Sequence, residues 1–459
     1  MDNNEVKKLQ EERISLYDDF YNNKLPKRLP VDAMRMSLNM LAEYSGKNIF
    51  NVQFDYSQLA EAHEKVTNEL YSDVSPLAGA GVATRIPSFY QILGSQSFVM
   101  GGSGLMQHPE VVGMLEEDYD ALIEDPYACL LERVIPRQYK ALDSNNTAST
   151  SKVIPMAQAA LRDNAAAIGA IVQKATEEKG YYPGPPRGSA GFGAAPYDFL
   201  ADQLRSFSGI SKDIRRNRNK VKEACEALYP LMLKYAMPAK PSPQGIVSTP
   251  LHMPTFMREK DVVDVWLPTY KKMVEQLAAA GARVNAFCEH DWMRYLDLLT
   301  ELPAGTILRF EYGDPQTIKD KLGKKYIISG LYPINLIKTG TKQQVIDKAK
   351  EILDIMMPGG GYLFGFDKGA LVYKDINMEN YIALAEFVRD YAVYENAGES
   401  FGTPLNSEGF KLEPAPVKSK YIFDWEEFKG KYPYTPEFAK ANFQGYDDEM
   451  FRFYLNLLV

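Results

Sequence analysis

The chain has 459 residues, of which 45% are hydrophobic and 24% charged, and this composition suits one large folded domain or two smaller ones. A formal net charge of -8 and the lack of any run of five basic residues argue against nucleic-acid binding. The three cysteines, Cys129, Cys225 and Cys288, are too widely spaced to suggest disulfides or an all-thiolate zinc site. The sequence has neither a leader-like start nor about 18 consecutive apolar residues, so we expect a cytoplasmic protein without a membrane span.

The first part of the chain predicts mainly helices. Apolar residues at helical spacing predict a helix over residues 6–23, and Pro26 ends it before a short extended run that begins the first strand. Residues 98–102 predict a strand that leads into a glycine loop, and helices are expected over residues 110–141 and 154–179. Residues 180–196 fit no regular element, and two interpretations stay open: a lid or pocket wall, or a flexible surface loop.

The second part of the chain alternates strands and helices at short spacing. Helices are predicted over residues 197–207, 212–235, 262–280, 293–299, 316–322, 342–355 and 378–394, and strands over residues 245–252, 284–288, 306–310, 326–330 and 362–366. Parallel strands joined by helices form a doubly wound sheet or a closed barrel, and the number of units favours the barrel. We therefore predict an α/β protein, a (β/α)8 TIM barrel over residues 31–395, with an N-terminal helical extension over residues 1–30 and a C-terminal extension over residues 396–459 that packs on the barrel.

Reactive side chains gather just past two of the predicted strands. Glu289, His290 and Asp291 follow one buried strand, and His252 follows the strand before it. Because the loops after the strands of a closed barrel form one face, where active sites lie, we expect these residues to meet there. A single histidine in such a position usually has a structural role, but two histidines at neighbouring strand ends make a functional role equally plausible.

A metal site at this face is an open alternative. If a metal is bound, the candidate ligands are Glu289, His290, Cys288 and Asp367, although their spacing matches no standard zinc motif. Glu311 follows another strand and supplies a further carboxylate that can bind a ligand or donate a proton.

The order of several short motifs resembles the uroporphyrinogen decarboxylase superfamily over residues 13–391. The matching stretches are residues 25–31, 196–205, 251–254, 288–292, 330–333 with 339–341, and 359–362. The resemblance implies a (β/α)8 barrel.

Within that superfamily the chain is most similar to corrinoid-dependent methyltransferases that demethylate methoxylated aromatic compounds in anaerobes. The Arg-Gln-Ala-Gly-Arg signature of the decarboxylase is replaced near Arg35 by residues 34–38, while residues 97–109 and 291–303 are similar to the O-demethylase type. Thiol-methylating relatives carry a His-x-Cys zinc motif, and here the matching positions are Phe287, Cys288 and Glu289. Thiolate activation is therefore not expected, whereas an oxygen-bound zinc stays possible.

This resemblance implies which residues act on the substrate. His290 or a nearby tyrosine is expected to donate a proton to the leaving phenolic oxygen, oriented by Glu289 and Asp291. The rest of the predicted substrate-binding set consists of Tyr182, Phe192 and Tyr197 around the aromatic ring, together with Arg85, His252 and Glu311.

The resemblance also implies a partner. No histidine of the chain lies in the Asp-x-His-x-x-Gly arrangement of cobalamin-binding domains, so the corrinoid is expected on a separate protein that docks over the barrel mouth. Three alternatives remain: a decarboxylase that binds a polycarboxylate, a corrinoid methyltransferase with another methyl donor, and a non-catalytic scaffold. The sequence permits an oligomer without specifying one.

Overall fold

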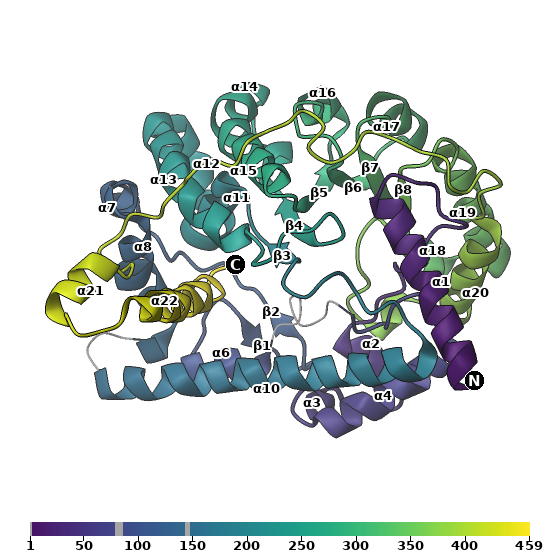
Figure 1. Cartoon of the computed structure of the whole chain (residues 1–459), viewed down its shortest axis with the longest axis horizontal. Coiled ribbons are helices and arrows are strands. Elements are labelled where there is room, and N and C mark those ends of the chain that lie inside the picture. The colour runs from purple at the N-terminus through teal and green to yellow at the C-terminus, as the bar shows by residue number, and fades with distance from the viewer. Residues whose placement is uncertain (1, 79–85, 143–146) are drawn as a thin grey trace.

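A six-stranded parallel sheet forms the centre of the molecule (Figure 1), a computed structural model that describes residues 2–78, 86–142 and 147–459. Its strands pair in chain order, so each neighbour in the sequence is also a neighbour in the sheet. The strands are β3 (Gly191–Phe192), β4 (Ile246–Leu251), β5 (Arg283–Asp291), β6 (Ile307–Tyr312), β7 (Ile327–Tyr332) and β8 (Tyr362–Phe366). The predicted α/β class is confirmed.

Helices cover the outer face of this sheet and form the arc at the top of Figure 1. The helical segments between and after the strands are α11 (Pro196–Asp198), η4 (Phe199–Arg205), α12 (Phe207–Arg216), α13 (Arg218–Ala236), η5 (Met253–Phe256), α14 (Glu259–Asp261), η6 (Val262–Trp266), α15 (Leu267–Ala279), η7 (Met293–Tyr295), α16 (Leu296–Leu299), α17 (Pro315–Leu322), α18 (Ile334–Thr339), α19 (Lys342–Met356), η8 (Tyr373–Asp375) and α20 (Met378–Tyr391). Most of them match the predicted helices within a few residues.

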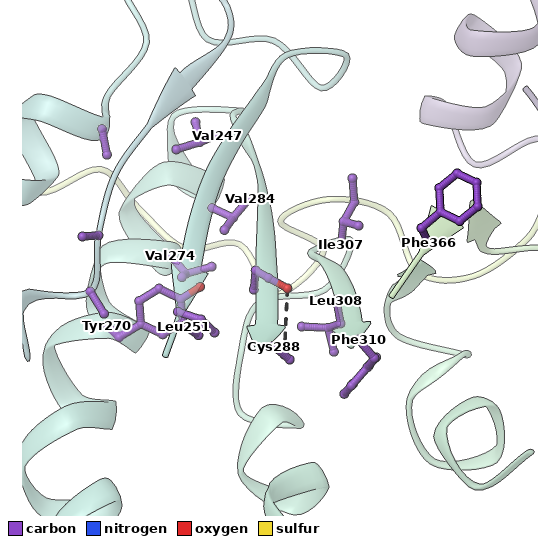
Figure 2. Packing of buried hydrophobic residues seen from close by; sticks show 14 of the residues in the cluster. Val247, Leu251, Tyr270, Val274, Val284, Cys288, Ile307, Leu308, Phe310 and Phe366 are labelled. Carbon is purple, nitrogen blue, oxygen red and sulfur yellow. Dashed lines mark hydrogen bonds between the residues drawn. The ribbon is translucent and has the colours of Figure 1, made fainter. Parts of the chain in front are cut away.

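The two faces of the strands differ in burial. In β4, Val247, Thr249 and Leu251 are fully buried, whereas the alternate residues Ile246 and Pro250 are only partly covered. Because successive side chains of a strand point to opposite faces, the first set packs under the helices and the second faces the interior of the curved sheet. Figure 2 shows part of the outward layer, in which Val247, Leu251, Cys288 and Phe310 lie among buried apolar side chains.

The sheet does not close into a continuous barrel within the described part of the chain. The gap beside it is occupied by two extended segments joined by single backbone bonds: Asp73 N–H donates to Val31 O at 2.8 Å, and Tyr182 N–H donates to Asp73 O at 2.8 Å. The Asp73 carboxylate also accepts the Val31 N–H at 2.7 Å, and Arg13 and Arg28 bind the same carboxylate. The Val31 N–H therefore donates to the Asp73 side chain, whereas in a regular strand ladder it would donate to a backbone carbonyl. This explains why no strand forms here.

Helices precede the sheet, as predicted, but they are more numerous than predicted, and several of them are short. The predicted helix over residues 110–141 is divided because Pro126 and Pro136 each stand at the start of a new helical turn, where proline is tolerated. The elements of this region are α1 (Asn3–Tyr21), α2 (Leu38–Tyr44), α3 (Ile49–Val52), α4 (Tyr56–Glu69), α6 (Pro87–Leu93), β1 (Val99–Met100), β2 (Met106–Gln107), η1 (Glu116–Asp118), α7 (Tyr119–Glu124), α8 (Pro126–Cys129), η2 (Leu130–Val134), α9 (Ile135–Gln138), η3 (Lys140–Leu142) and α10 (Thr147–Lys179).

The C-terminal segment runs outside the helical arc as a long strap before it forms helices again (Figure 1). The strap begins beside the end of α1, where Leu25 N–H donates to Glu399 O at 2.8 Å and Phe401 N–H donates to Asn23 O at 2.9 Å. It ends in α21 (Trp425–Lys431), η9 (Glu437–Ala439) and α22 (Lys440–Leu455). Arg452 of α22 donates to the carbonyl of Tyr235 at 3.0 Å, which joins this end of the chain to α13.

Candidate active site

Three side chains from three elements meet at the carboxyl ends of β4 and β5. His252 Nδ1 lies 3.1 Å from Asp202 Oδ2, and His252 Nε2 lies 3.0 Å from Glu289 Oε1. Leu251 of β4 pairs with Cys288 of β5, so the next residues along the two strands, His252 and Glu289, are neighbours. We call these three residues the relay. It lies at the end of the sheet where parallel α/β enzymes place their active sites.

The imidazole of His252 is held as a cation by its two carboxylates. Burial lowers the pKa of His252, but the hydrogen bonds and charges of Asp202 and Glu289 outweigh burial and raise this pKa from 6.5 to about 10. Both ring nitrogens therefore carry protons at neutral pH. The relay is a protonated imidazole with one proton directed to each carboxylate.

A third carboxylate fixes the backbone beneath the relay. Asp198 accepts the N–H groups of His252 at 2.8 Å and Met253 at 3.0 Å, and Trp266 Nε1–H donates to it at 2.5 Å. Burial and the charge of Asp202 raise the pKa of Asp198 to about 7. Asp198 and Asp202 are one helical turn apart, and Asp202 lies in the π-helical segment η4, a rare form that occurs often at functional sites.

Two cavities adjoin this end of the sheet. His252 and Asp202 line the first, of about 400 Å³, which we call the relay cavity, together with aromatic side chains at Phe192, Phe199 and Phe207. The second, of about 730 Å³, occupies the interior of the sheet, and we call it the lumen cavity. Both lie within the size range of small-molecule sites.

The lumen cavity is open because small or polar residues face inward. Asn285, Ser329 and Gly365 line it at positions where barrel interiors usually carry large branched side chains. A Cβ on Gly365 would come within 3.0 Å of the Gly330 backbone nitrogen, so this close approach requires glycine. The Asn285 Oδ1 atom is buried there without a hydrogen-bond partner in the protein.

The part of the chain that contains the relay matches a known family. Residues 187–391 match the model of the uroporphyrinogen decarboxylase family. The chain is similar to this family over that range. All three relay residues and Asp198 lie within it, and the resemblance that the sequence motifs indicated is confirmed over these residues.

The other comparisons concern the fold. A solved structure described as a methyltransferase from Methanosarcina mazei superposes with a TM-score of 0.50 at 14% sequence identity, and the match covers 84% of this chain and 98% of that chain. At this identity the likeness is one of fold. A search of curated proteins found no match.

Within the matched residues, His290 and Asp291 lie at the rim of the sheet and not in the relay. His290 is exposed, adopts a φ of 62°, and packs edge-on against Phe256 with ring centroids 5.1 Å apart. Its backbone N–H donates to Glu311 at 2.8 Å, and the other Glu311 oxygen accepts from Lys368 Nζ at 2.9 Å. Asp291 is also exposed and accepts the N–H of Met293 at 2.9 Å.

Other predicted site residues are placed away from the relay. Cys288 is fully buried among the outward side chains of Figure 2, and this burial raises the pKa of its thiol far above the usual value. Tyr182 stacks on Tyr17 with ring centroids 4.0 Å apart, and Tyr197 is 1% exposed, so neither lines the two cavities. Of the predicted ring contacts, Phe192 lines the relay cavity.

The remaining predictions concern metal binding, Arg85 and membranes. Asp367 accepts the backbone N–H groups of Ile334 and Lys368, and Arg85 lies outside the described residues. In the part of the chain that the structure describes, no three His, Cys, Asp or Glu side chains are grouped to hold a metal ion. Cys288 points away and both nitrogens of His252 contact carboxylates, so these residues do not fit a zinc site as placed. No helix among the described residues is long and apolar enough to cross a membrane.

The sequence analysis missed Asp202 and Asp198 as functional candidates. Asp198 and Asp202 were part of the stretch that resembles the family, but they received no role. Their spacing of four residues, which brings two carboxylates to one side of a helical segment, was the available signal.

Proposed function

We propose that the chain transfers a methyl group from a methoxylated aromatic compound to cob(I)alamin carried on a separate corrinoid protein. The observation that carries this proposal is the position of His252 between Asp202 and Glu289 at the end of the sheet, which raises the pKa of His252. The family match of residues 187–391 supports an enzyme, and the solved methyltransferase of similar fold supports group transfer as its reaction class.

The relay suits an oxygen leaving group. In the reaction a bond forms from the methyl carbon to cobalt, the bond from that carbon to the ether oxygen breaks, and the bond's electron pair passes to the oxygen. The developing phenolate needs a proton or a positive charge for its stabilisation. A tyrosine phenol has a pKa of about 10, and the pKa of His252 is raised to about 10. Proton transfer from the relay to a phenolate therefore becomes favourable only as the bond breaks.

Each member of the relay has a distinct role in this proposal. Glu289, whose side chain is 24% exposed, is the member that meets the substrate oxygen and passes on the proton of His252 Nε2. Asp202 is a positioning residue that holds Nδ1 and stabilises the imidazole ring as it loses its proton. Asp198 holds the backbone of His252 in place.

The rim of this end of the sheet offers a surface for the corrinoid protein. Phe207, Phe256 and Leu371 lie in segments that follow strands of the sheet and are 47%, 56% and 74% exposed, and Tyr312, the last residue of β6, is 47% exposed. Phe207 and Phe256 contact each other with ring centroids 5.3 Å apart, and Phe207 also lines the relay cavity. Exposed apolar side chains around a cavity are typical of a protein-binding surface.

One assay tests the proposal directly. The purified chain is mixed with a corrinoid protein in the Co(I) state and a panel of methyl donors, and the cobalt spectrum is followed as Co(I) is converted to methyl-Co(III). We expect conversion with aromatic methyl ethers and a slow reaction with His252→Gln. A spectral change with methylamines but with no ether would contradict the proposed donor class, and no change with any donor would contradict methyl transfer.

A further inference from the structure

Strand β5 carries one extra residue at the point where it reaches the relay. The register with β6 shifts there, because the paired positions are Cys288 with Phe310 and then Asp291 with Tyr312. Glu289 and His290 therefore stand together opposite the single residue Glu311. Such a β-bulge re-aims the side chains around it, and bulges are frequent beside active sites. His290 has a φ of 62°, a left-handed conformation that is uncommon outside glycine and persists where the surroundings support it.

The peptide group between Glu289 and His290 is held at both ends. Its N–H, which belongs to His290, donates to Glu311 Oε2 at 2.8 Å. Its carbonyl, which belongs to Glu289, accepts the indole N–H of Trp292 at 2.8 Å. Because a peptide group is planar and includes the preceding Cα, these two bonds also fix the direction in which the Glu289 side chain starts.

The two side chains that hold this peptide group are themselves fixed. The Glu311 side chain is 10% exposed, and its other oxygen accepts Lys368 Nζ at 2.9 Å. Burial raises the pKa of Glu311, but the hydrogen bonds from the His290 N–H and from Lys368 outweigh burial and keep this pKa below its usual value. Trp292 is buried and packs edge-on against Trp266, with ring centroids 5.7 Å apart.

The held peptide group lies directly behind a relay contact. Asn285, Phe287 and Glu289 alternate with the fully buried residues of β5, so their side chains face the interior of the sheet. Glu289 Oε1 lies 3.0 Å from His252 Nε2. Hydrogen bonds weaken steeply with poorer distance and angle, so a turn of this peptide group would weaken the contact between Glu289 and His252.

We propose that Glu311 and Trp292 are positioning residues for the relay: by holding the peptide group between Glu289 and His290, they keep the Glu289 carboxylate against His252. This inference rests on the proposed function, because it adds two residues to the account of the same site. Both act through the backbone and touch neither the substrate nor the reacting atoms. Lys368 supports Glu311 in this role, and the side chain of His290 is not needed for it.

Two conservative variants separate position from charge. Glu311→Asp keeps the charge, but its side chain is one methylene shorter, so its carboxylate is withdrawn from the His290 N–H. Glu311→Gln keeps the length and an oxygen that can accept this N–H, but it loses the charge. The readout is the pKa of His252, measured by proton NMR in the full chain with neither corrinoid protein nor methyl donor. We expect this pKa to fall by at least about one unit toward 6.5 in Glu311→Asp, because Glu289 no longer pairs with His252, and to change little in Glu311→Gln.

The same substitutions at Glu301 are the matched controls. Glu301 pairs with Lys271 at 2.9 Å and not with the relay, so neither Glu301→Asp nor Glu301→Gln should change the pKa of His252. An unchanged pKa in Glu311→Asp would overturn the proposal. A fall in Glu311→Gln as large as that in Glu311→Asp would assign the effect to charge and overturn it too. If Glu311→Asp fails to fold, Trp292→Phe removes the other bond to the same peptide group and keeps an aromatic ring, and an unchanged pKa of His252 in that variant would overturn the proposal.

Methyl transfer gives a second readout of the same order of variants. Single-turnover transfer should slow at least about tenfold in Glu311→Asp and stay within about threefold of wild type in Glu311→Gln, because a small misplacement of a catalytic group is costly. The pKa values do not depend on methyl transfer. A chain that transfers no methyl group but shows the expected order of pKa values would therefore refute the reaction and not the positioning.

Discussion

Replacing Asp202 by Asn is expected to lower the pKa of His252 and the stability of the folded chain together. The two carboxylates raise this pKa from 6.5 to about 10. Removing one of the two charges should remove roughly half of the increase, which leaves a pKa of roughly 8. A difference of about two pKa units corresponds to about 3 kcal/mol. The His252 side chain is 39% exposed, so solvent screening reduces the expected loss of folding free energy to about 1 kcal/mol.

The sign of the pH dependence follows from the raised pKa. A histidine whose folded-state pKa exceeds its unfolded value stabilises the fold fully below the unfolded pKa of 6.5 and loses this effect as the pH rises through about 10. In Asp202→Asn the effect is lost earlier, as the pH passes roughly 8. The wild-type chain should therefore be more stable than the variant by the largest amount near pH 6, with a difference that shrinks from about pH 8 and disappears above about pH 10.

Two measurements check this prediction. Urea unfolding of both proteins at about pH 6, 8 and 10.5 gives the difference in unfolding free energy. Proton NMR of the four histidines gives the pKa of His252 itself, with His252→Gln to assign the resonance. Asp264→Asn is the matched control, because Asp264 pairs with Arg218 at 2.8 Å and not with the relay. A wild-type His252 that titrates near its ordinary pKa, or an Asp202→Asn variant with an unchanged pKa, would refute the reasoning.

Three further predictions concern residues around the relay. Glu289→Gln keeps the size of the side chain but removes its charge, so single-turnover methyl transfer should slow at least about 100-fold. A rate within threefold of wild type would exclude Glu289 from the proton path. His290→Ala should raise the KM for the corrinoid protein with little change in kcat, since His290 lies on the exposed rim beside Phe256; a lost kcat with an unchanged KM would restore His290 as the proton donor. Cys288→Ala should lower the free energy of unfolding, measured by thermal unfolding, by about 1–2 kcal/mol through lost packing, and it should retain methyl transfer. An inactive but folded variant would show that the thiol takes part in the reaction.

Local patterns in the sequence were sufficient for the strands and helices that build the sheet. The strand predicted over residues 362–366 has the same bounds in the structure, and the predicted pairing of the β4 and β5 ends does bring His252 close to Glu289. Both outcomes depend on short-range periodicity and on the shared direction of parallel strands. The same reasoning also named His290, the residue after Glu289, as catalytic. It could not separate these two neighbours, because one residue of shift along a strand reverses the face to which a side chain points.

The sequence by itself determined the α/β class, the order of the elements and the strand end at which the reactive residues gather. Only the tertiary structure decided which of those residues meet, because Asp202 reaches His252 from a separate helical segment, 50 positions away, that no periodicity links to β4. It also decided the protonation of His252, since that depends on two carboxylates within about 3 Å and on partial burial. Long-range contacts of this kind arise from packing, which no local pattern records.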